Sequence, residues 1–431
     1  MSSGKHVLVV GTGPAGIVSA YGLALKGARV TLIDRETQVI DSPRAMVYLP
    51  STVKALDKLG LLDEARKLGP ESYDYQCYFA QSGNVGRMDH RLVQDLTPYH
   101  FILHFGQDVL ANMVLERLLA LPGTEVKWGT TLEAIEQRDD QVLATVSDAT
   151  GQHVIAADWL IGADGARSTV RKLIGATFDG FTWPDTFMAT NIEFDFGKHG
   201  FADSNMVSDP VNWAVIARID NSGLWRVAYG EDSELTEQER LDRVDQRLRH
   251  WLPEGAEYRL VRANSYRVHQ RSASSYRAGR VLLAGDAAHA TNPIGGMGFT
   301  SGIQDAVTLV DLLAKVLNGE TSDDVLDWYA YERRRIFLEI ANPTAIEFKR
   351  RTQEADPQKR LEDEQNFLHL VEDTDTMRVA LMSIFGLESR PYQVGWRESV
   401  VPEDQQRSGS DKAKSLVGGT TSTLRHTEEI E

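Results

Sequence analysis

The stretch from His6 to Asp34 reads HVLVVGTGPAGIVSAYGLALKGARVTLID, and it decides the fold. An apolar run leads into a turn with glycine at Gly11, Gly13 and Gly16, and an acid ends the next apolar run 18 residues later. Such glycines let the backbone approach a pyrophosphate, the helix N-terminus stabilises its charge, and the acid accepts bonds from a ribose. The stretch predicts a dinucleotide site, without distinguishing NAD from FAD. The alternative is a glycine-rich turn without a ligand.

Strands and helices alternate around this unit. Apolar periodicity, N-cap residues and terminal glycines mark the helices, and short β-branched runs between turn residues mark the strands. The predicted helices are Pro14–Lys26, Thr52–Leu59 with Ser51 as its N-cap, Asp108–Leu119 and Ser168–Leu173. The predicted strands are His6–Val10, Arg29–Asp34, Glu125–Trp128, Leu132–Glu136, Val142–Ser147, His153–Ala156 and Trp159–Ala163.

The region of residues 178–275 has a different pattern. Aromatic and β-branched runs at Val211–Ile219 and Leu224–Tyr229 predict a second sheet, with a charged helix near Glu237–Trp251. The first pattern then returns. We predict a strand at Arg280–Ala287, a long helix at Gly298–Leu317, and a further helix at Asp324–Arg351 that Pro343 kinks or breaks.

These patterns predict an α/β fold: a Rossmann-like dinucleotide-binding domain with an inserted mixed or antiparallel β-sheet substrate domain and C-terminal helices. The first domain is discontinuous and comprises residues 1–177 and 276–335, with parts of 70–110 facing the substrate domain. Residues 178–275 form the substrate domain and 336–401 the helical region. Residues 402–431 are rich in Ser, Thr, Gly and charges, which predicts a disordered tail.

Composition narrows the class of protein. The 431 residues are 42% hydrophobic and 25% charged, with a mean hydropathy of -0.31, as in soluble globular proteins. A net charge of -16 repels phosphate backbones, so we expect no nucleic-acid partner. The single cysteine, Cys77, cannot form an internal disulfide, which indicates a reducing compartment, the cytoplasm. No run approaches the ~20 apolar residues of a transmembrane helix.

Two further motifs define the cofactor. Residues 159–171 read WLIGADGARSTVR, and residues 280–292 read RVLLAGDAAHATN, followed by Pro293 and a glycine-rich segment with Gly295, Gly296 and Gly298. Together with the N-terminal glycines, they closely resemble the three signatures of the single-component flavoprotein aromatic hydroxylases, the family of p-hydroxybenzoate hydroxylase. The resemblance spans most of residues 5–335.

The resemblance implies an FAD-dependent monooxygenase that uses NADPH or NADH and O₂ to hydroxylate or epoxidise a small aromatic or electron-rich substrate through a C4a-hydroperoxyflavin. It implies noncovalent FAD. Asp164 and Gly165, with Ser168 and Arg171 behind them, would then serve FAD and nicotinamide binding. Asp286 would hold ribityl or ribose hydroxyls, although an aspartate there could also cap a helix.

Three more residues are assigned to the cofactor site. Arg35 follows the acid Asp34, and Arg44 in a Pro-Arg-Ala segment resembles the arginine that reaches the cofactor phosphates. Gln107 resembles the glutamine that contacts the ribityl chain. Arg44 could equally be a solvated surface charge, and Gln107 could simply begin a helix.

Pro293, Gly295 and Gly296 are our candidates for the floor of the reaction chamber. The helix that starts at Gly298 directs positive charge at a flat ring, which would stabilise the negative charge of reduced flavin by ~0.3 to 2 kcal/mol. No acid–base residue is certain. His289 is expected to pack or orient the loop, and the isolated His104 and His269 to be structural. No metal-ligand spacing and no Gly-x-Ser-x-Gly elbow occur.

Substrate contacts are expected from one face of Asn191–Phe196, Val211–Ile219 and Leu224–Tyr229. Alternation separates Asn212, Ile216 and Arg218 from Trp213 and Val215, but does not say which set faces inward.

Other activities share this fold. They include flavin-dependent epoxidases, halogenases and isoprenoid reductases, and the non-catalytic GDP-dissociation-inhibitor-like binders. The Trp-x-Trp-x-Ile-Pro segment of the halogenases is absent, and the two later flavin motifs argue against a non-catalytic binder. The substrate, the choice between NADH and NADPH and the oligomeric state stay open.

Overall fold

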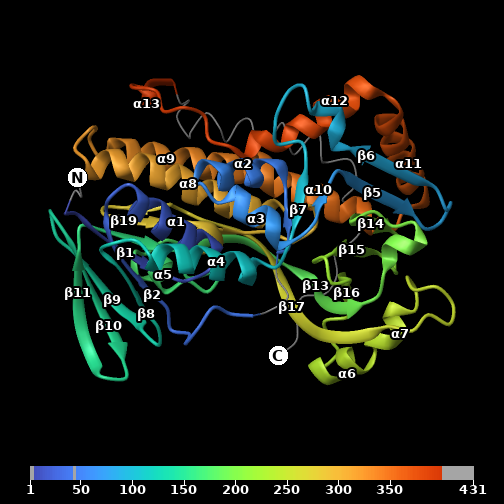
Figure 1. Ribbon diagram of the computed structural model, residues 1–431, viewed down its shortest axis with the longest axis horizontal. Coiled ribbons are helices and arrows are strands. Elements are labelled where there is room, and N and C mark those ends of the chain that lie inside the picture. Colours follow the sequence, from blue (N-terminus) through green and yellow to red (C-terminus); the bar gives the residue numbers. More distant parts are fainter. Residues whose placement is uncertain (1–3, 42–44, 400–431) are drawn as a thin grey trace, which may run out of the picture. The chain divides into compact units, whose positions relative to one another are not determined.

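A six-stranded sheet forms around the first glycine-rich turn, in the order β18-β19-β12-β1-β2-β8 (Figure 1). Neighbouring strands pair in parallel except at one edge, where β18 is antiparallel to β19. The computed structural model describes residues 4–41 and 45–399. The strands are β1 (His6–Val10), β2 (Arg29–Ile33), β8 (Thr124–Lys127), β12 (Trp159–Gly162), β18 (Arg277–Ala278) and β19 (Val281–Leu283). The predicted Rossmann-like sheet is thus confirmed.

Helices pack on this sheet. The helix α1 (Pro14–Leu25) begins directly after the glycine turn and packs against α4 (Gln107–Leu119) and α8 (Met297–Leu317). A Cβ on Gly22 would lie 2.7 Å from Val310, so glycine at this position allows α1 and α8 to approach closely. The remaining helices of this region are α2 (Pro50–Lys58), α3 (Leu62–Leu68) and α5 (Thr169–Leu173).

Two predicted boundaries in this region are wrong. Ser51 is the second residue of α2 and not its cap, because Pro50 has the fixed φ that suits a first helical turn and starts the helix. The strand predicted for Arg280–Ala287 ends at Leu283. Gly285 has a φ of +61° and turns the chain into a short 3-10 helix, Gly285–Ala287.

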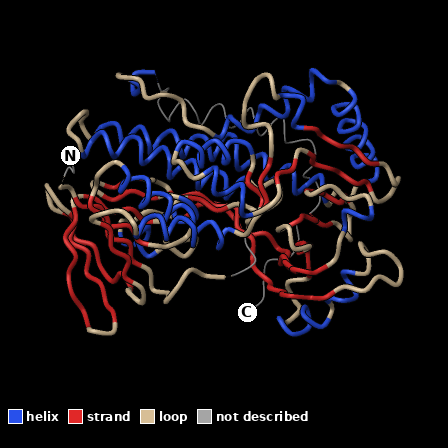
Figure 2. The backbone as a smooth tube through the Cα atoms, viewed as in Figure 1, coloured by secondary structure: helices blue, strands red, loops and turns tan. Residues whose placement is uncertain are grey.

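Two small sheets complete the first region. The strands β9 (Thr131–Gln137), β10 (Val142–Asp148) and β11 (Gly151–Ala157) form an antiparallel sheet where three strands were predicted. Figure 2 shows this sheet projecting beyond the helices. The other sheet has the order β3-β7-β4, with β3 (Val47–Tyr48), β4 (Glu71–Ser72) and β7 (Ile102–His104).

The second large sheet has eight strands in the order β20-β17-β13-β16-β15-β14-β5-β6. Five strands come from the predicted region, and β5, β6 and β20 come from distant parts of the chain; β14 and β5 pair in parallel, so the sheet is mixed. The strands are β5 (Asp74–Phe79), β6 (Val85–Asp89), β13 (Phe178–Glu193), β14 (Ser204–Ser208), β15 (Ala214–Arg218), β16 (Leu224–Glu231), β17 (Arg259–Ala273) and β20 (His289–Ala290).

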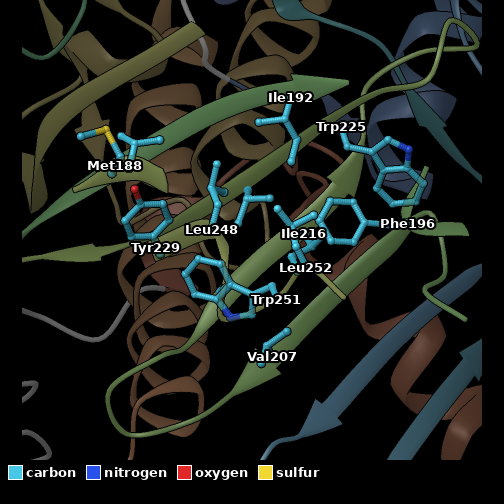
Figure 3. Packing of buried hydrophobic residues seen from close by; sticks show 13 residues of the cluster. Met188, Ile192, Phe196, Val207, Ile216, Trp225, Tyr229, Leu248, Trp251 and Leu252 are labelled. Atoms are coloured by element: carbon cyan, nitrogen blue, oxygen red, sulfur yellow. The ribbon is translucent and has the colours of Figure 1, made fainter. Parts of the chain in front are cut away.

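One face of this sheet is closed by a buried apolar cluster. Figure 3 shows Leu248, Trp251 and Leu252 pointing toward Ile216 and Tyr229 of the sheet. The single helix predicted near Glu237–Trp251 is in fact two short helices, α6 (Glu237–Asp242) and α7 (Val244–Leu248). With this face filled, the opposite face is the one available to a ligand.

The C-terminal part is helical, as predicted. It comprises α9 (Asp324–Ile336), α10 (Asn342–Thr352), α11 (Pro357–Glu372) and α12 (Thr374–Met382). The predicted break near Pro343 takes the form of a π-helical segment, Phe337–Ala341, directly before α10. Residues 390–399 belong to a separate unit that contains α13 (Trp396–Ser399), and the tail predicted for 402–431 lies outside the described residues.

Among the described helices, none combines the length and the apolar character that crossing a membrane requires.

Candidate active site

One cavity of about 1130 Å³ lies between the glycine-rich turns and the free face of the eight-stranded sheet. Most predicted site residues line this single cavity, although they are spread over nearly 290 positions of the chain. They are Gly11, Gly13, Asp34, Arg35, Gln107, Asp164, Gly165, Asp286, Pro293, Gly295, Gly296 and Gly298. Gly16 lies behind the wall, and Arg44 lies outside the described residues.

The first glycine motif forms one end of the cavity. A Cβ on Gly11, whose φ is +107°, would lie 2.3 Å from the Ala163 carbonyl oxygen, and a Cβ on Gly16 would lie 2.0 Å from the Gly11 oxygen. Both glycines therefore allow close packing of β1, α1 and β12. A Cβ on Gly13 would meet only ordinary contacts, so its bare backbone leaves room on the cavity side.

The carboxylate of Asp34 is held at this end. One oxygen accepts hydrogen bonds of 2.7 Å from both the backbone N–H and the hydroxyl of Thr12, and the other accepts one of 3.0 Å from the Glu36 N–H. This places an oriented acceptor beside the glycine turn, as the ribose contact requires.

The Asp-Gly motif has a structural part that the sequence did not specify. Asp164 accepts a 2.5 Å bond from the Ser168 hydroxyl and a 2.6 Å bond from the Thr169 N–H, which fixes the start of α5. Arg171 donates to the carbonyl oxygens of Ala166 at 2.7 Å and Ala287 at 2.8 Å. The Asp-Gly and Gly-Asp loops are therefore tied together at the cavity wall.

A buried ionic network lies behind the Gly-Asp loop. Asp305 of α8 accepts hydrogen bonds from the Gly285 N–H at 3.0 Å, from His289 Nε2 at 2.6 Å and from Arg333 Nε at 2.7 Å. His289, Asp305 and Arg333 are at most 1% exposed. Arg333 also donates to the Leu387 carbonyl at 2.8 Å. His289 stacks on Phe337, so its geometry agrees with the expected packing role.

Asp286 itself is exposed in the cavity lining and lies inside the 3-10 turn. It does not cap α8, whose N-cap is Gly296, so the helix-cap alternative does not apply to that helix. The network around Asp305 was missed from the sequence. An aspartate within the apolar run of α8 was its only signal.

The start of α8 forms the middle of the cavity. Gly295 and Gly296 have φ values of +81° and +70°, and a Cβ on Gly295 would lie 2.2 Å from the Phe348 ring. A left-handed conformation without a side chain is what this sharp entry to the helix needs. The free N–H groups of the first turn of α8 thus adjoin the cavity. Gln107 begins α4 and also lines the cavity, and its contact with the ribityl chain stays a prediction.

Of the two alternating sets of residues in Val211–Ile219, the set with Trp213 and Val215 lines the cavity. Ile216 of the other set packs in the apolar cluster, Asn212 accepts a bond from Arg247, and Arg218 pairs with Asp203. Phe187 of β13 and Tyr266 of β17 also line the cavity, which makes this wall aromatic.

Arg226 is a cation in this wall that the sequence analysis did not single out. It is buried, its Nε donates to the Asn191 side-chain oxygen at 3.0 Å, and burial lowers the pKa of its guanidinium to about 10. An arginine inside an otherwise apolar strand was the available signal.

The far end of the cavity is built by β5, β6 and the C-terminal helices. Its lining includes Tyr75, Met88, His90, Leu381 and Ile384.

The two isolated histidines have different surroundings. His104 is buried and bonds the Arg218 carbonyl at 2.9 Å, and burial lowers its pKa. His269 lines the cavity near the Asp-Gly motif and bonds the Thr182 hydroxyl at 2.9 Å.

The cavity fits a flavin dinucleotide. The bare backbone of Gly13 leaves room at its glycine turn, a helix N-terminus adjoins its middle, and an oriented carboxylate lies at one end. Over the described ranges, no group of His, Cys, Asp and Glu side chains is arranged to hold a metal ion.

Comparison with known proteins agrees with this geometry. A family model described as FAD binding domain matches residues 5–342. The chain belongs to this family of FAD-binding flavoproteins, within the group of aromatic hydroxylases that the three motifs resemble.

Particular relatives are similar over nearly the whole chain. Para-nitrophenol 4-monooxygenase of a Pseudomonas species is 41% identical over 388 residues, covering 89% of this chain and 96% of that enzyme. The 6-hydroxy-3-succinoylpyridine 3-monooxygenase of Pseudomonas putida is 37% identical over 383 residues, covering 88% and 98%. The crystal structure of p-nitrophenol 4-monooxygenase PnpA from Pseudomonas putida has a TM-score of 0.88 at 41% identity, covering 91% and 100%. The protein is therefore an FAD-dependent aromatic monooxygenase.

Proposed function

We propose that this enzyme oxygenates a single-ring aromatic compound that carries a hydroxyl group, at the ring carbon para to that hydroxyl. Two relatives that this chain matches over nearly their whole length act, by their names, on a nitrophenol and a hydroxypyridine. In each name the oxygenated position is the substituted carbon para to the hydroxyl. The aromatic wall of Phe187, Trp213 and Tyr266 supports a flat ring as the ligand.

The residues of the chain position the reactants. Bound FAD supplies the redox chemistry, by taking hydride from a nicotinamide and activating O₂. The glycine turn and Asp34 would hold the adenosine and pyrophosphate part, Asp286 and Gln107 the ribityl part, and the segment from Pro293 to Gly298 the flat ring. The apolar walls exclude water from the substrate, which protects a reactive oxygen donor.

We further propose that NADPH or NADH binds transiently at the rim near the Asp-Gly motif. The sequence has no second glycine fingerprint for a permanent nicotinamide domain. Arg167 and Arg267 line the cavity there, and both lower the pKa of the neighbouring His269, after burial and Arg271 as the larger causes. Such a basic rim suits the phosphates of a nicotinamide cofactor in a chain of net charge -16. Arg44 stays a predicted phosphate contact.

We place the enzyme in the cytoplasm, without a nucleic-acid partner. Cys77 is buried, and burial raises the pKa of its thiol to about 12, which suits an inert cysteine in a reducing compartment. The predicted limits of the substrate domain, 178–275, stay a proposal.

The experiment is a screen of para-substituted hydroxyarenes with the FAD-loaded enzyme. Oxidation of NADPH or NADH, the oxygenated product and H₂O₂ are measured together. We expect at least one compound to give about one product per nicotinamide oxidised. If every compound yields only H₂O₂, or none stimulates oxidation, this function is wrong. An alkene that is epoxidised while hydroxyarenes are inert would favour the epoxidase alternative. Acid precipitation should leave the flavin in the supernatant, because we propose that it is bound noncovalently.

A further inference from the structure

His90 lies at the substrate end of the cavity, in the part of the wall that β5, β6 and the C-terminal helices form. It follows the last residue of β6 and begins a 3-10 helix, His90–Val93. Met88, two positions before it, pairs with Tyr75 of β5, and all three residues line the cavity. Since side chains two positions apart in a strand point the same way, His90 continues the cavity-facing row. Its side chain is 7% exposed.

The hydrogen bonds of His90 fix its tautomer. The Tyr73 carbonyl oxygen accepts the backbone N–H of His90 at 2.8 Å and lies 3.0 Å from its Nδ1. A carbonyl oxygen can only accept, so Nδ1 carries the proton in the neutral ring and Nε2 has a free lone pair. Among residues 4–41 and 45–399, none donates a hydrogen bond to Nε2. The ring therefore offers the cavity an oriented acceptor.

The surroundings keep this ring neutral near pH 7. Burial lowers the pKa of His90, opposed by the hydrogen bond to Tyr73 and by the carboxylates of Asp89 and Asp74, while His100 lowers it further. The two carboxylates are themselves paired, Asp89 with Arg91 and Asp74 with both Arg87 and Arg91. The helix α12 packs against the 3-10 helix that His90 begins, and its Arg378 is likewise paired, with Asp95.

The other cavity histidine is less suited to a proton from a ring hydroxyl. Its Nδ1 is 2.9 Å from the Thr182 hydroxyl, and its charged neighbours are mainly arginines. These arginines favour a bound anion at the rim. They disfavour a second positive charge on His269 itself.

We propose that His90 is the catalytic base that accepts, at Nε2, the proton of the ring hydroxyl of the aromatic substrate. This inference rests on the proposed function, because it requires a hydroxyarene. In the step, the substrate O–H bond breaks, the Nε2–H bond forms, and the electron pair stays on the oxygen. Nothing is oxidised or reduced. The resulting oxyanion makes the para carbon more electron-rich, which is the carbon to be oxygenated.

The test uses 4-nitrophenol as the probe, because its phenolate absorbs at longer wavelength than its phenol. It is bound to the FAD-loaded enzyme at a pH where most of the free probe is protonated. No nicotinamide is added, so no turnover occurs. Its methyl ether, 4-nitroanisole, has no proton to give. We expect the wild-type enzyme to bind 4-nitrophenol as phenolate and more tightly than the ether.

Two substitutions separate the functions of the imidazole. Asparagine in H90N can still donate to the Tyr73 carbonyl but places no acceptor at the Nε2 position. Glutamine in H90Q can present an amide oxygen there but cannot take the proton. We expect both to lose the phenolate signal. The Kd of H90N for 4-nitrophenol should rise at least about tenfold, equivalent to ~1.4 kcal/mol, and that of H90Q should rise less.

The control is H100N, which replaces a neighbouring imidazole that packs on the ring of Tyr73 but does not line the cavity. It should keep the phenolate signal, and all variants should keep their FAD content. Equal phenolate fractions in wild type and H90N would overturn the proposal, as would a wild-type enzyme that does not prefer 4-nitrophenol to its ether. If His90-dependent phenolate forms but the screen finds no oxygenated hydroxyarene, only the proposed function fails.

Discussion

The substitution D305N tests the buried network behind the cofactor loop. Asparagine has nearly the same shape as aspartate but carries no charge. Its single amide oxygen cannot serve the three donors that converge on Asp305, which are the Gly285 N–H, His289 and Arg333. Its NH₂ group would face a donor in place of an acceptor. The guanidinium of Arg333, which is 1% exposed, then keeps its charge without a carboxylate beside it.

The magnitude follows from this geometry. Removing one partner of a buried ion pair costs about 3 to 5 kcal/mol, because the other charge stays desolvated and uncompensated. An exposed acid on the same helix should behave differently. Asp311 is on the solvent side of α8, so D311N should change the free energy of unfolding by no more than about 0.5 kcal/mol.

The assay is denaturant unfolding at a fixed excess of FAD, because bound ligand adds to the apparent stability. If D305N lowers the free energy of unfolding by less than about 1 kcal/mol, the reasoning is refuted. The pH dependence gives a second check. His289 and Arg333 lower the pKa of Asp305 against the raising effect of burial. The stabilisation by the Asp305 carboxylate is therefore complete above its unfolded pKa of about 3.9 and is lost as the pH falls through its lower folded pKa. The difference in free energy of unfolding between wild type and D305N should accordingly become smaller in acid.

Three further predictions concern the cofactor and its control. D286A should weaken FAD binding without loss of fold, so that added FAD raises the melting temperature of the wild type but not of the variant; equal rises would contradict the assignment. G295A should destabilise the protein by more than G83A, because both glycines have φ near +80° but only Gly295 would place its Cβ against Phe348; similar melting temperatures would show that backbone strain alone acts. The true substrate should accelerate anaerobic flavin reduction by NADPH at least about tenfold, equivalent to ~1.4 kcal/mol of barrier, and equal rates in stopped flow would exclude such gating.

The glycine motifs were predictable because they carry their chemistry locally. A turn with a φ of +107° at Gly11, or an entry to a helix with positive φ at Gly295 and Gly296, requires glycine whatever surrounds it. The order of strands and helices followed from periodicity for the same reason. Boundaries failed where one residue decided them, as at Pro50 and Gly285.

The substrate end was not predictable because it depends on contacts between distant segments. Alternation gave two sets of residues in Val211–Ile219, but only the packing of Ile216 in the apolar cluster shows that the set with Trp213 faces the cavity. His90 follows an edge strand whose place in the sheet depends on a partner far along the chain. No local pattern relates it to the flavin motifs.

The parallel pairing of β5 with β14 has a consequence for how the protein is made. The hairpin of β5 and β6 leaves the ribosome about 120 residues before β14 is complete, which is roughly 6 to 24 s of synthesis. During that time one edge of the hairpin presents unpaired N–H and C=O groups that could join a strand of another chain. When many ribosomes translate one messenger RNA, this hairpin should therefore favour aggregation of neighbouring nascent chains. Slower initiation increases the spacing between these chains, so it should raise the yield of soluble protein more than slower elongation does.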